Sequence, residues 1–277
     1  MILFLLRNIV MNEFSLKNKN IIITGGAGFL GEQHVLAVAE KGGTPIIFDN
    51  NNLNILKLKK KLSNLKIKSY FFKGNVASEK SLLSFKKFLK KKKLYPNVII
   101  NNAALNPKLN KINSSNLLEK YSIKDWNKEI EIGLTGAFLT SKIIGSVMSK
   151  KLGGGIIINI SSDLGLIAPD NRIYNLSKKL INVKPVSYSI IKHGIIGLTK
   201  YLATYWADKN VRTNCLCPGG IYENQDKAFI KRISKLIPLK RMARVDEYKG
   251  AIQFLCSDAS SYMNGSNLII DGGRTIW

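Results

Sequence analysis

Seven short apolar runs, each rich in isoleucine and valine, alternate along the chain with longer stretches of amphipathic helical pattern. Short, continuously apolar runs are typical of strands that are buried on both faces, as in a parallel sheet. Their alternation with helical segments predicts a doubly wound α/β fold, in which helices cover both faces of the sheet. The expected strands are residues 21–24, 45–49, 68–73, 97–101, 156–160, 211–216 and 267–270.

The chain is long enough for one large domain and contains no segment with the composition of a linker. With 277 residues, 45% of them hydrophobic, it can bury a full core. We therefore expect one domain over residues 16–277, after an N-terminal extension, residues 1–15, that is not expected to be ordered. The first ten residues are mostly apolar, but a membrane span needs about 20 apolar residues. No membrane partner is expected.

Positive charge dominates the chain, with 43 lysines and arginines against 18 aspartates and glutamates and a formal net charge of +25. Such a balance can indicate a polyanionic partner. Here the charged runs at 57–61 and 86–93 are interleaved with leucine and phenylalanine at helical spacing, which is typical of the solvated faces of amphipathic helices. We therefore predict no nucleic-acid partner.

The chain has three cysteines, too few for a disulfide framework or a zinc site. Cys215 and Cys217 alternate along an apolar run, so they are expected to share one face of a buried strand. We expect a reduced, cytoplasmic protein with no bound metal.

A glycine-rich loop follows the first expected strand and opens a helix. Its sequence is Thr24-Gly25-Gly26-Ala27-Gly28-Phe29-Leu30-Gly31. In this context glycines let the backbone approach a pyrophosphate, and the free N–H groups of the first helical turn face the phosphate charge. The loop predicts dinucleotide binding and, with the alternating pattern, a Rossmann-type seven-stranded parallel sheet.

Asp49 ends the second expected strand, 24 residues beyond Gly25. A carboxylate at this position can accept hydrogen bonds from the adenosine ribose hydroxyls and would repel a 2′-phosphate. Neither the glycine loop nor residues 50–52 supply a lysine or arginine that could pair with such a phosphate. We therefore predict that NAD(H), and not NADP(H), is the cofactor.

Three further motifs follow in the order of one known family. They are Asn101-Asn102-Ala103-Ala104, Asn159-Ile160-Ser161-Ser162 and Tyr188-Ser189-Ile190-Ile191-Lys192. Together with the glycine loop they resemble the short-chain dehydrogenase/reductase family, over about residues 20–271. The resemblance implies an NAD(H)-dependent oxidoreductase that transfers a hydride between the nicotinamide and a carbonyl or alcohol.

The resemblance implies a catalytic set of Ser162, Tyr188 and Lys192, with Ser161 as the alternative serine. In the family the serine hydrogen-bonds the substrate oxygen, and the lysine also holds the nicotinamide ribose. Tyr188 and Lys192 share a helical face, and an ammonium lowers the pKa of a nearby phenol, so the tyrosine is expected to act as acid or base near neutral pH. The implied cofactor contacts are Thr24, Gly25, Gly28, Phe29, Leu30, Gly31, Asp49, Asn75, Val76, Asn102, Ala103, Ala104, Tyr188, Lys192, Pro218, Gly219 and Ile221.

A second tyrosine competes for the catalytic role, because Tyr174 and Lys178 have the same spacing as Tyr188 and Lys192. A helix from Tyr174 would be interrupted by Pro185, whereas a helix that contains Tyr188 begins after this proline. We therefore predict Tyr188 as the catalytic tyrosine. The separation between Ser162 and Tyr188 is then about twice what is usual in the family. A segment within residues 163–187 is therefore expected to be inserted beside the substrate.

Three positions depart from the family pattern. Gly133 stands where the family usually has an asparagine that supports a proton-relay water, and we expect the backbone to hold that water in the room that glycine leaves. Asn224 is the candidate to replace a threonine that contacts the nicotinamide carboxamide. Asn75 takes the place of an adenine-contacting aspartate, and its amide offers both a donor and an acceptor.

The inserted segment carries more cations than acids, which predicts an anionic substrate such as a phosphorylated or nucleotide-linked sugar. Arg172 is the candidate phosphate contact, because a guanidinium can donate two parallel hydrogen bonds. The insertion also resembles dehydrogenases of bacterial surface-sugar or nonulosonic-acid pathways.

Two other functions match parts of the sequence. The glycine spacing resembles that of nucleotide-sugar epimerases and dehydratases, although only 58 residues follow Gly219, whereas those enzymes usually have a larger C-terminal domain. The loss of an asparagine at Gly133 would suit a catalytically silent NAD-sensing protein, although NAD binding alone does not require Tyr188.

The helices expected at residues 126–150 and 188–209 carry more apolar side chains than one face of a sheet can cover. In the family the corresponding helices pair across a two-fold axis. The resemblance therefore implies a homodimer or homotetramer.

Overall fold

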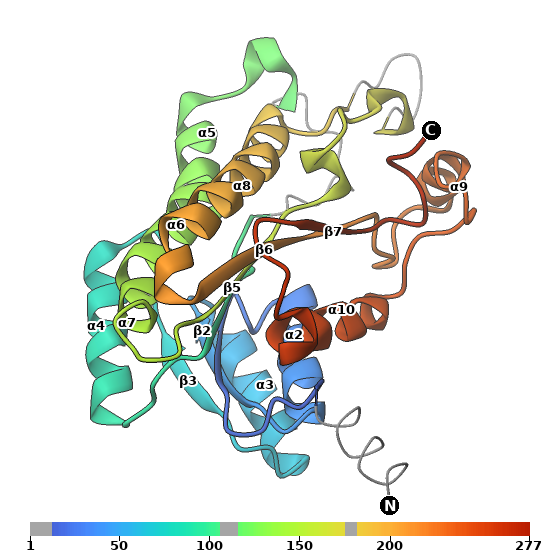
Figure 1. The fold of residues 1–277 in the computed structure, drawn as a ribbon. Coiled ribbons are helices and arrows are strands. Elements are labelled where there is room, and N and C mark those ends of the chain that lie inside the picture. The colour runs from blue at the N-terminus through green and yellow to red at the C-terminus, as the bar shows by residue number, and fades with distance from the viewer. Residues whose placement is uncertain (1–12, 106–115, 175–181) are drawn as a thin grey trace, which may run out of the picture.

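The computed structural model describes residues 13–105, 116–174 and 182–277, and these residues build one seven-stranded sheet (Figure 1). Its strand order is β3-β2-β1-β4-β5-β6-β7, and every neighbouring pair is parallel. The strands are β1 (Asn20–Thr24), β2 (Thr44–Asp49), β3 (Tyr70–Lys73), β4 (Val98–Asn101), β5 (Gly155–Ile160), β6 (Val211–Pro218) and β7 (Asn267–Ile270). The predicted Rossmann-type, doubly wound parallel sheet is confirmed.

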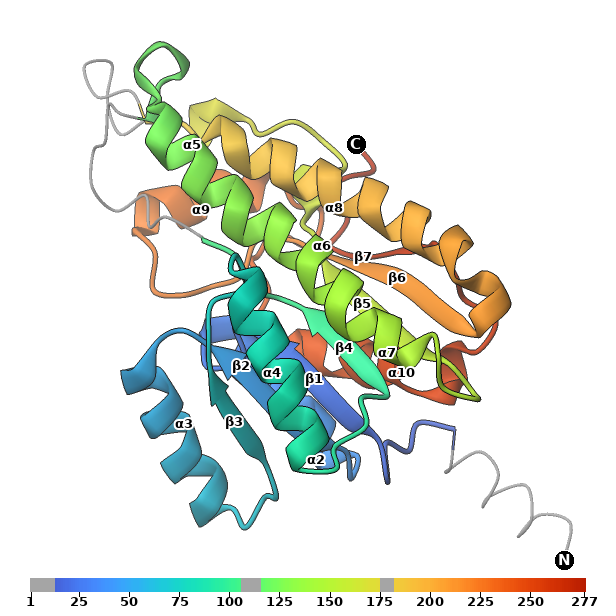
Figure 2. The same cartoon turned by 90° about the vertical axis from the view of Figure 1, so that its left-hand side faces the viewer.

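Helices cover both faces of the sheet. One face packs against α2 (Phe29–Glu40), α3 (Asn52–Asn64) and α10 (Lys249–Cys256). The other face packs against α4 (Glu79–Lys91), a long helix over Ile123–Met148 and α8 (Val186–Tyr205), which lie in front of the sheet in Figure 2. The long helix contains α5 (Ile123–Ile130), α6 (Gly136–Thr140) and α7 (Ser146–Met148), with the π-helical stretches η3 (Glu131–Thr135) and η4 (Ser141–Gly145) between them.

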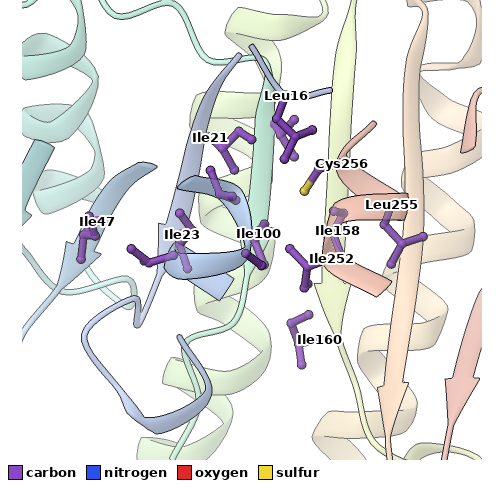
Figure 3. Packing of buried hydrophobic residues seen from close by; sticks show 14 of the residues in the cluster. Leu16, Ile21, Ile23, Ile47, Ile100, Ile158, Ile160, Ile252, Leu255 and Cys256 are labelled. Carbon is purple, nitrogen blue, oxygen red and sulfur yellow. The ribbon is translucent and has the colours of Figure 1, made fainter. Parts of the chain in front are cut away.

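The apolar strands supply side chains to both faces, which explains why they are continuously apolar in sequence. Ile21 and Ile23 pack into the cluster that contains Ile252 of α10, as Figure 3 shows, whereas Ile22 joins the cluster on the opposite face. All are fully buried. Burying an isoleucine side chain contributes about 1.5–3 kcal/mol to the free energy of folding. The two core layers therefore stabilise the packing of the sheet between the helices.

Cys215 and Cys217 share one face of β6, as predicted, with their sulfur atoms 3.8 Å apart. Both are buried as free thiols in the cluster beneath α8. Their position is that of core side chains.

The element boundaries differ from the expected ones by a few residues. The strand expected at 211–216 continues to Pro218, and the strand expected at 68–73 begins at Tyr70. The helix expected from residue 126 begins at Ile123, because the hydroxyl of Ser122 accepts a hydrogen bond from the Asp125 amide at 3.0 Å and caps the first turn.

Residues 1–12 of the expected N-terminal extension lie outside the described residues. The last part of the extension packs against the C-terminal region. The Glu13 carbonyl accepts a hydrogen bond from the Ala259 amide at 3.2 Å, and the Phe14 ring lies 6.4 Å from that of Phe254.

Among the described residues, one helix, Ile123–Met148, is long and apolar enough to cross a membrane by length and composition. In its most apolar window 44% of the residues are buried inside the protein. Figure 2 shows this helix between α4 and α8, against the sheet. A helix that covers a sheet passes the same test, so the prediction of no membrane partner stays a prediction.

Candidate active site

A cleft of about 860 Å³ lies at the carboxyl edge of the sheet. Gly25 follows β1 on its wall, Asn102 follows β4, Ser161 follows β5, and Gly219 follows β6. The strand order reverses between β1 and β4, which is the topological switch point at which open α/β sheets bind ligands. The volume of the cleft lies in the range of about 300–1,000 Å³ that is usual for small-molecule sites.

The glycine loop brings the backbone against the start of α2. A Cβ atom on Gly31 would lie 2.1 Å from the Gly25 carbonyl oxygen, and Gly25 itself has φ of +61°. Gly28 is the N-cap residue and makes no side-chain cap, so the first-turn N–H groups of α2 are left for a ligand. The residues of this turn line the cleft. This arrangement fits a pyrophosphate group.

Thr24 differs from the prediction, because it does not line the cleft. It is buried, and its hydroxyl accepts hydrogen bonds from the Asn102 and Ala103 amides at 3.1 Å each. The Asn102 side chain donates to the Thr24 and Gly25 carbonyls at 3.0 and 3.1 Å. Thr24 and Asn102 therefore hold the glycine loop against the turn after β4.

Asp49 lines the cleft at the end of β2 and is 7% exposed. Its carboxylate accepts hydrogen bonds from the Ala27 amide at 3.0 Å and the Asn51 amide at 2.9 Å. The described neighbours that line the cleft beside it are asparagines, with no lysine or arginine among them. Lys57 lies in a separate hollow, beside Gly28.

The remaining predicted cofactor contacts share one property, since all of them line the cleft. They are Gly25, Gly28, Phe29, Leu30, Gly31, Asp49, Asn75, Val76, Asn102, Ala103, Ala104, Tyr188, Lys192, Pro218, Gly219 and Ile221.

Tyr188 and Lys192 lie one turn apart on α8, whose N-cap residue is Pro185. The Lys192 ammonium lies 5.6 Å from the centre of the Tyr188 ring and donates a 2.9 Å hydrogen bond to the Ile160 carbonyl. Ser162, two residues beyond Ile160, lies close enough to Tyr188 to lower the pKa of its phenol. The three predicted catalytic residues therefore meet at one end of the cleft.

The two candidate serines have different partners. The Ser161 hydroxyl is buried and donates to the Lys192 carbonyl at 2.7 Å, which joins β5 to α8. The Ser162 hydroxyl donates to the Asp163 carboxylate at 2.7 Å and lies beside Tyr188. This geometry favours Ser162 as the serine that faces a substrate.

The predicted effect of Lys192 on the phenol is wrong for the protein alone. Burial raises the pKa of Tyr188 to about 12, against smaller lowering effects from Ser162 and Arg274. Burial also lowers the pKa of Lys192 to about 8. Tyr188 is therefore protonated near neutral pH, which suits a proton donor.

The room that glycine was expected to leave at position 133 is filled on the side where a Cβ would lie, whereas a water held by the backbone there stays a prediction. Gly133 is buried in η3 and packs on α8, where a Cβ atom would lie 2.9 Å from Ile191 Cγ2. The Ile191 side chain fills the space beside the glycine. An asparagine at this position would collide with it.

Tyr174 lines the same cleft as Tyr188. It ends the short helix η6 (Asn171–Tyr174) in the inserted segment, and its ring lies 5.6 Å from that of Phe229 in a stacked arrangement. Burial raises the pKa of its phenol. Lys178, its partner in the competing motif, lies outside the described residues.

Two predicted substrate contacts do not line the cleft. Arg172 forms a two-bonded ion pair with Asp170, at 2.9 and 2.8 Å, and its side chain is 88% exposed. Asn224 is exposed and turns the backbone with φ of +55°. A carboxylate two residues away already satisfies the guanidinium of Arg172.

Asp163 and Lys184 of the inserted segment line this end of the cleft, together with three residues that were not predicted from sequence, Phe229, Arg232 and Arg274. Arg274 follows the Asp271-Gly272-Gly273 motif after β7, and Arg232 lies on the amphipathic helix α9 (Lys227–Lys235). Only the motif beside Arg274 gave a sequence signal.

The chain is similar over almost its whole length to proteins of one family. A family model described as enoyl-(acyl carrier protein) reductase matches residues 27–275. A short-chain dehydrogenase from Leptospira borgpetersenii serovar Hardjo-bovis, solved with bound NAD+, is 29% identical, with a TM-score of 0.78 over 95% of this chain and 94% of that chain. The chain belongs to the short-chain dehydrogenase/reductase family.

Two further members of the short-chain dehydrogenase/reductase family illustrate its range. An NAD-dependent glycerol dehydrogenase from Listeria innocua is 30% identical over 95% of this chain and 96% of its own length. A gluconate 5-dehydrogenase from Burkholderia cenocepacia, solved with NADP and tartrate, is 25% identical, with a TM-score of 0.83 over 96% of this chain and 98% of that chain. The protein is an oxidoreductase of this family. Of the relatives described above, some are named or solved with NAD and one with NADP.

Proposed function

We propose that the protein is an NAD(H)-dependent dehydrogenase or reductase that interconverts an alcohol and a carbonyl in a polyhydroxylated, anionic small molecule. The proposal rests on one observation. Ser162, Tyr188 and Lys192 lie together at one end of a cleft that the glycine loop also lines. Binding of a dinucleotide alone would not require the tyrosine.

The side chains divide the chemical work among them. A nicotinamide bound in the cleft supplies or accepts the hydride. Tyr188 moves the proton at the substrate oxygen, and its raised pKa suits donation to a carbonyl. Ser162 holds that oxygen beside the phenol, while Lys192 provides positive charge where the nicotinamide ribose would lie.

The choice of NAD over NADP rests on Asp49. Its carboxylate would face the adenosine ribose, where it accepts hydroxyl hydrogen bonds and repels a 2′-phosphate. The described cleft residues beside it carry no cation to offset that repulsion. The NAD-dependent glycerol dehydrogenase is one relative with this cofactor choice.

The proposed substrate class rests on the cleft and on the relatives. Glycerol and gluconate, named for two relatives, are polyhydroxylated, and gluconate is also anionic. Lys184 and Arg232 line the cleft of this chain and favour negative charge. A phosphorylated or nucleotide-linked sugar, as in surface-sugar or nonulosonic-acid pathways, stays a prediction within this class.

We further propose a homodimer or homotetramer in the cytoplasm. Large apolar side chains on the outer faces of the helix Ile123–Met148 and α8 support self-association, because monomers rarely leave such side chains clustered in water. The exposed residues are Ile123, Phe138, Ile190, Tyr201 and Tyr205.

The test of the function is turnover. Purified protein is incubated with NAD+ and a panel of polyols and sugar acids, or with NADH and the matching ketones, and absorbance of the reduced nicotinamide is followed. The proposal expects activity with at least one pair. Cofactor binding without any hydride transfer, across both directions of the panel, would favour the NAD-sensing alternative.

A further inference from the structure

Arg232 has a guanidinium group that the protein satisfies only in part. Its Nε donates a 2.8 Å hydrogen bond to the Ile173 carbonyl. Its Nη2 is buried and has no hydrogen-bond partner within residues 13–105, 116–174 and 182–277. No described carboxylate forms an ion pair with it. The side chain nevertheless lines the cleft.

An arginine whose guanidinium lacks hydrogen-bond partners is suited to bind an anion. A guanidinium keeps its proton at any ordinary pH, so it cannot escape the cost of burial by becoming neutral. Arg232 is half-buried, and its Nη2 is removed from water without an acceptor, so a ligand that brings a negative charge offsets that cost.

Asp163, Glu223 and Asp226 line the cleft on this side, and Asp163 and Asp226 have other partners. Asp163 pairs with Arg274 at 2.7 Å. Asp226 caps α9 by accepting hydrogen bonds from the Ala228 and Phe229 amides at 2.9 and 3.1 Å. Neither carboxylate neutralises Arg232.

The position of Arg232 suits contact with a substrate and not with the adenosine end of a cofactor. Its partner Ile173 precedes Tyr174, and the Tyr174 phenol lies close enough to Tyr188 for their charges to interact. Lys184, the second cation here, lies 3.8 Å from the centre of the Tyr188 ring. Arg232 therefore belongs to the wall beside the proposed reacting groups.

We propose that Arg232 is the anion subsite of this cleft and binds a carboxylate or phosphate group carried by the substrate. The inference rests on the proposed dehydrogenase function for the identity of the reacting end. The hydrogen bond from Nε to the Ile173 carbonyl holds the guanidinium in one orientation. Its two terminal nitrogens can then donate hydrogen bonds to the anion.

The test uses two variants that separate charge from architecture. In Arg232→Gln the side-chain amide occupies the same chain position as the arginine Nε, so it can still donate to Ile173 while the charge is lost. Arg232→Met keeps an unbranched side chain as far as the ε position and removes both the hydrogen bond to Ile173 and the charge. Arg172→Gln is the matched control, because that arginine is exposed and does not line the cleft.

Two readouts are measured for each protein. The first is kcat/KM with NAD+ for gluconate, for a hexitol phosphate and for the neutral hexitol. The second is the shift in Tm produced by gluconate or by inorganic phosphate without turnover. The carboxylate and phosphate arms identify which anion the subsite takes.

The proposal expects kcat/KM for an anionic substrate to fall about 10- to 100-fold in both Arg232 variants, in line with the loss of one charged hydrogen-bonding partner. The neutral hexitol should change by less than about twofold, and Arg172→Gln should match the unmodified protein. Equal losses on charged and neutral substrates would mean that Arg232 only joins α9 to the inserted segment, and would overturn the subsite.

Failure of the proposed function is recognised separately. If the unmodified enzyme oxidises none of the three alcohols, the anion-induced shift in Tm decides the subsite on its own. A shift that is present in the unmodified protein and in Arg172→Gln, and is lost in Arg232→Gln, supports the subsite. No shift in any protein, or the same shift in all of them, overturns it.

Discussion

Arg274 and Asp163 form a buried ion pair beside Ser162, the proposed catalytic serine, with 2.7 Å between Arg274 Nη1 and Asp163 Oδ2 and with both side chains 4% exposed. The other oxygen of Asp163 accepts hydrogen bonds from the Ser162 hydroxyl at 2.7 Å and the Leu164 amide at 2.8 Å. The segment after β7 is thereby joined to the turn after β5, and the orientation of Ser162 depends on both.

Breaking this pair should destabilise the protein and lower its activity. Arg274→Met leaves the Asp163 carboxylate buried without a counter-ion, which costs about 3–5 kcal/mol of unfolding free energy. The measurement is urea unfolding, with kcat/KM on the best substrate. Arg241→Met is the control, because Arg241 pairs with Glu247 at the same distance on an exposed surface. Equal stability of the two variants would refute the structural role of the Arg274 pair.

Removing the Asp49 carboxylate should relax the choice between cofactors. In Asp49→Ala the ribose hydroxyls lose an acceptor and a 2′-phosphate is no longer repelled, so the ratio of NADP to NAD affinity should rise at least about tenfold. Fluorescence titration with NADH and NADPH gives both dissociation constants. Asp208→Ala, an exposed acid paired with Lys209, controls for net charge. An unmodified protein that binds both cofactors equally would contradict this account.

The pH dependence of carbonyl reduction should report Lys192. Burial lowers the pKa of Lys192 to about 8, so its ammonium is lost as the pH rises through that value, whereas Tyr188 keeps its proton to about pH 12. We expect kcat/KM with NADH to be level below about pH 7 and to fall about tenfold per pH unit well above pH 8. A plateau that continues to pH 10 would show that this ammonium is not required.

His34 should make stability depend on pH in mildly acidic solution. It is fully buried in α2, and burial lowers its pKa from 6.5 to about 3. Between these values the unfolded chain binds one more proton, so stability is complete above pH 6.5 and falls with decreasing pH. From pH 7.0 to pH 5.5 the unfolding free energy should drop by about 1 kcal/mol more in the unmodified protein than in His34→Leu.

The control for this prediction is His193→Gln, which removes the other histidine of the chain, an exposed one. Urea unfolding at the two pH values should give the same loss of stability for this variant as for the unmodified protein. If His34→Leu keeps the full loss, another group is responsible for it.

The sheet and the cofactor edge of the cleft could be predicted because their signals are local. Strands that are buried on both faces appear in the sequence as continuous apolar runs. The glycines of a phosphate loop stand directly between the strand and the helix that they join. Thus Gly25, Gly31 and Asp49 could be placed from sequence alone. Thr24 was misplaced because its hydroxyl turns towards the backbone after β4, a contact made 78 residues away.

The substrate end of the cleft could not be predicted in the same way, because packing between distant segments decides it. Arg172 was predicted from its place in the inserted segment, whereas its ion pair with Asp170 and the contact of Arg232 on α9 with Ile173 both depend on the fold. Likewise, the collision between Ile191 and any side chain at position 133 depends on how two helices pack.

The central claim is that Tyr188, and not the neighbouring Tyr174, moves the proton. Both phenols line the cleft and burial raises the pKa of both, but it is Tyr188 that lies beside Ser162 and Lys192. The decisive measurement is kcat and the NADH dissociation constant for Tyr188→Phe and Tyr174→Phe on the best substrate of the panel. We expect Tyr188→Phe to lower kcat by about 10²–10⁴-fold with NADH affinity almost unchanged, and Tyr174→Phe to retain most of its turnover. Loss of turnover in Tyr174→Phe, with Tyr188→Phe still active, would contradict it.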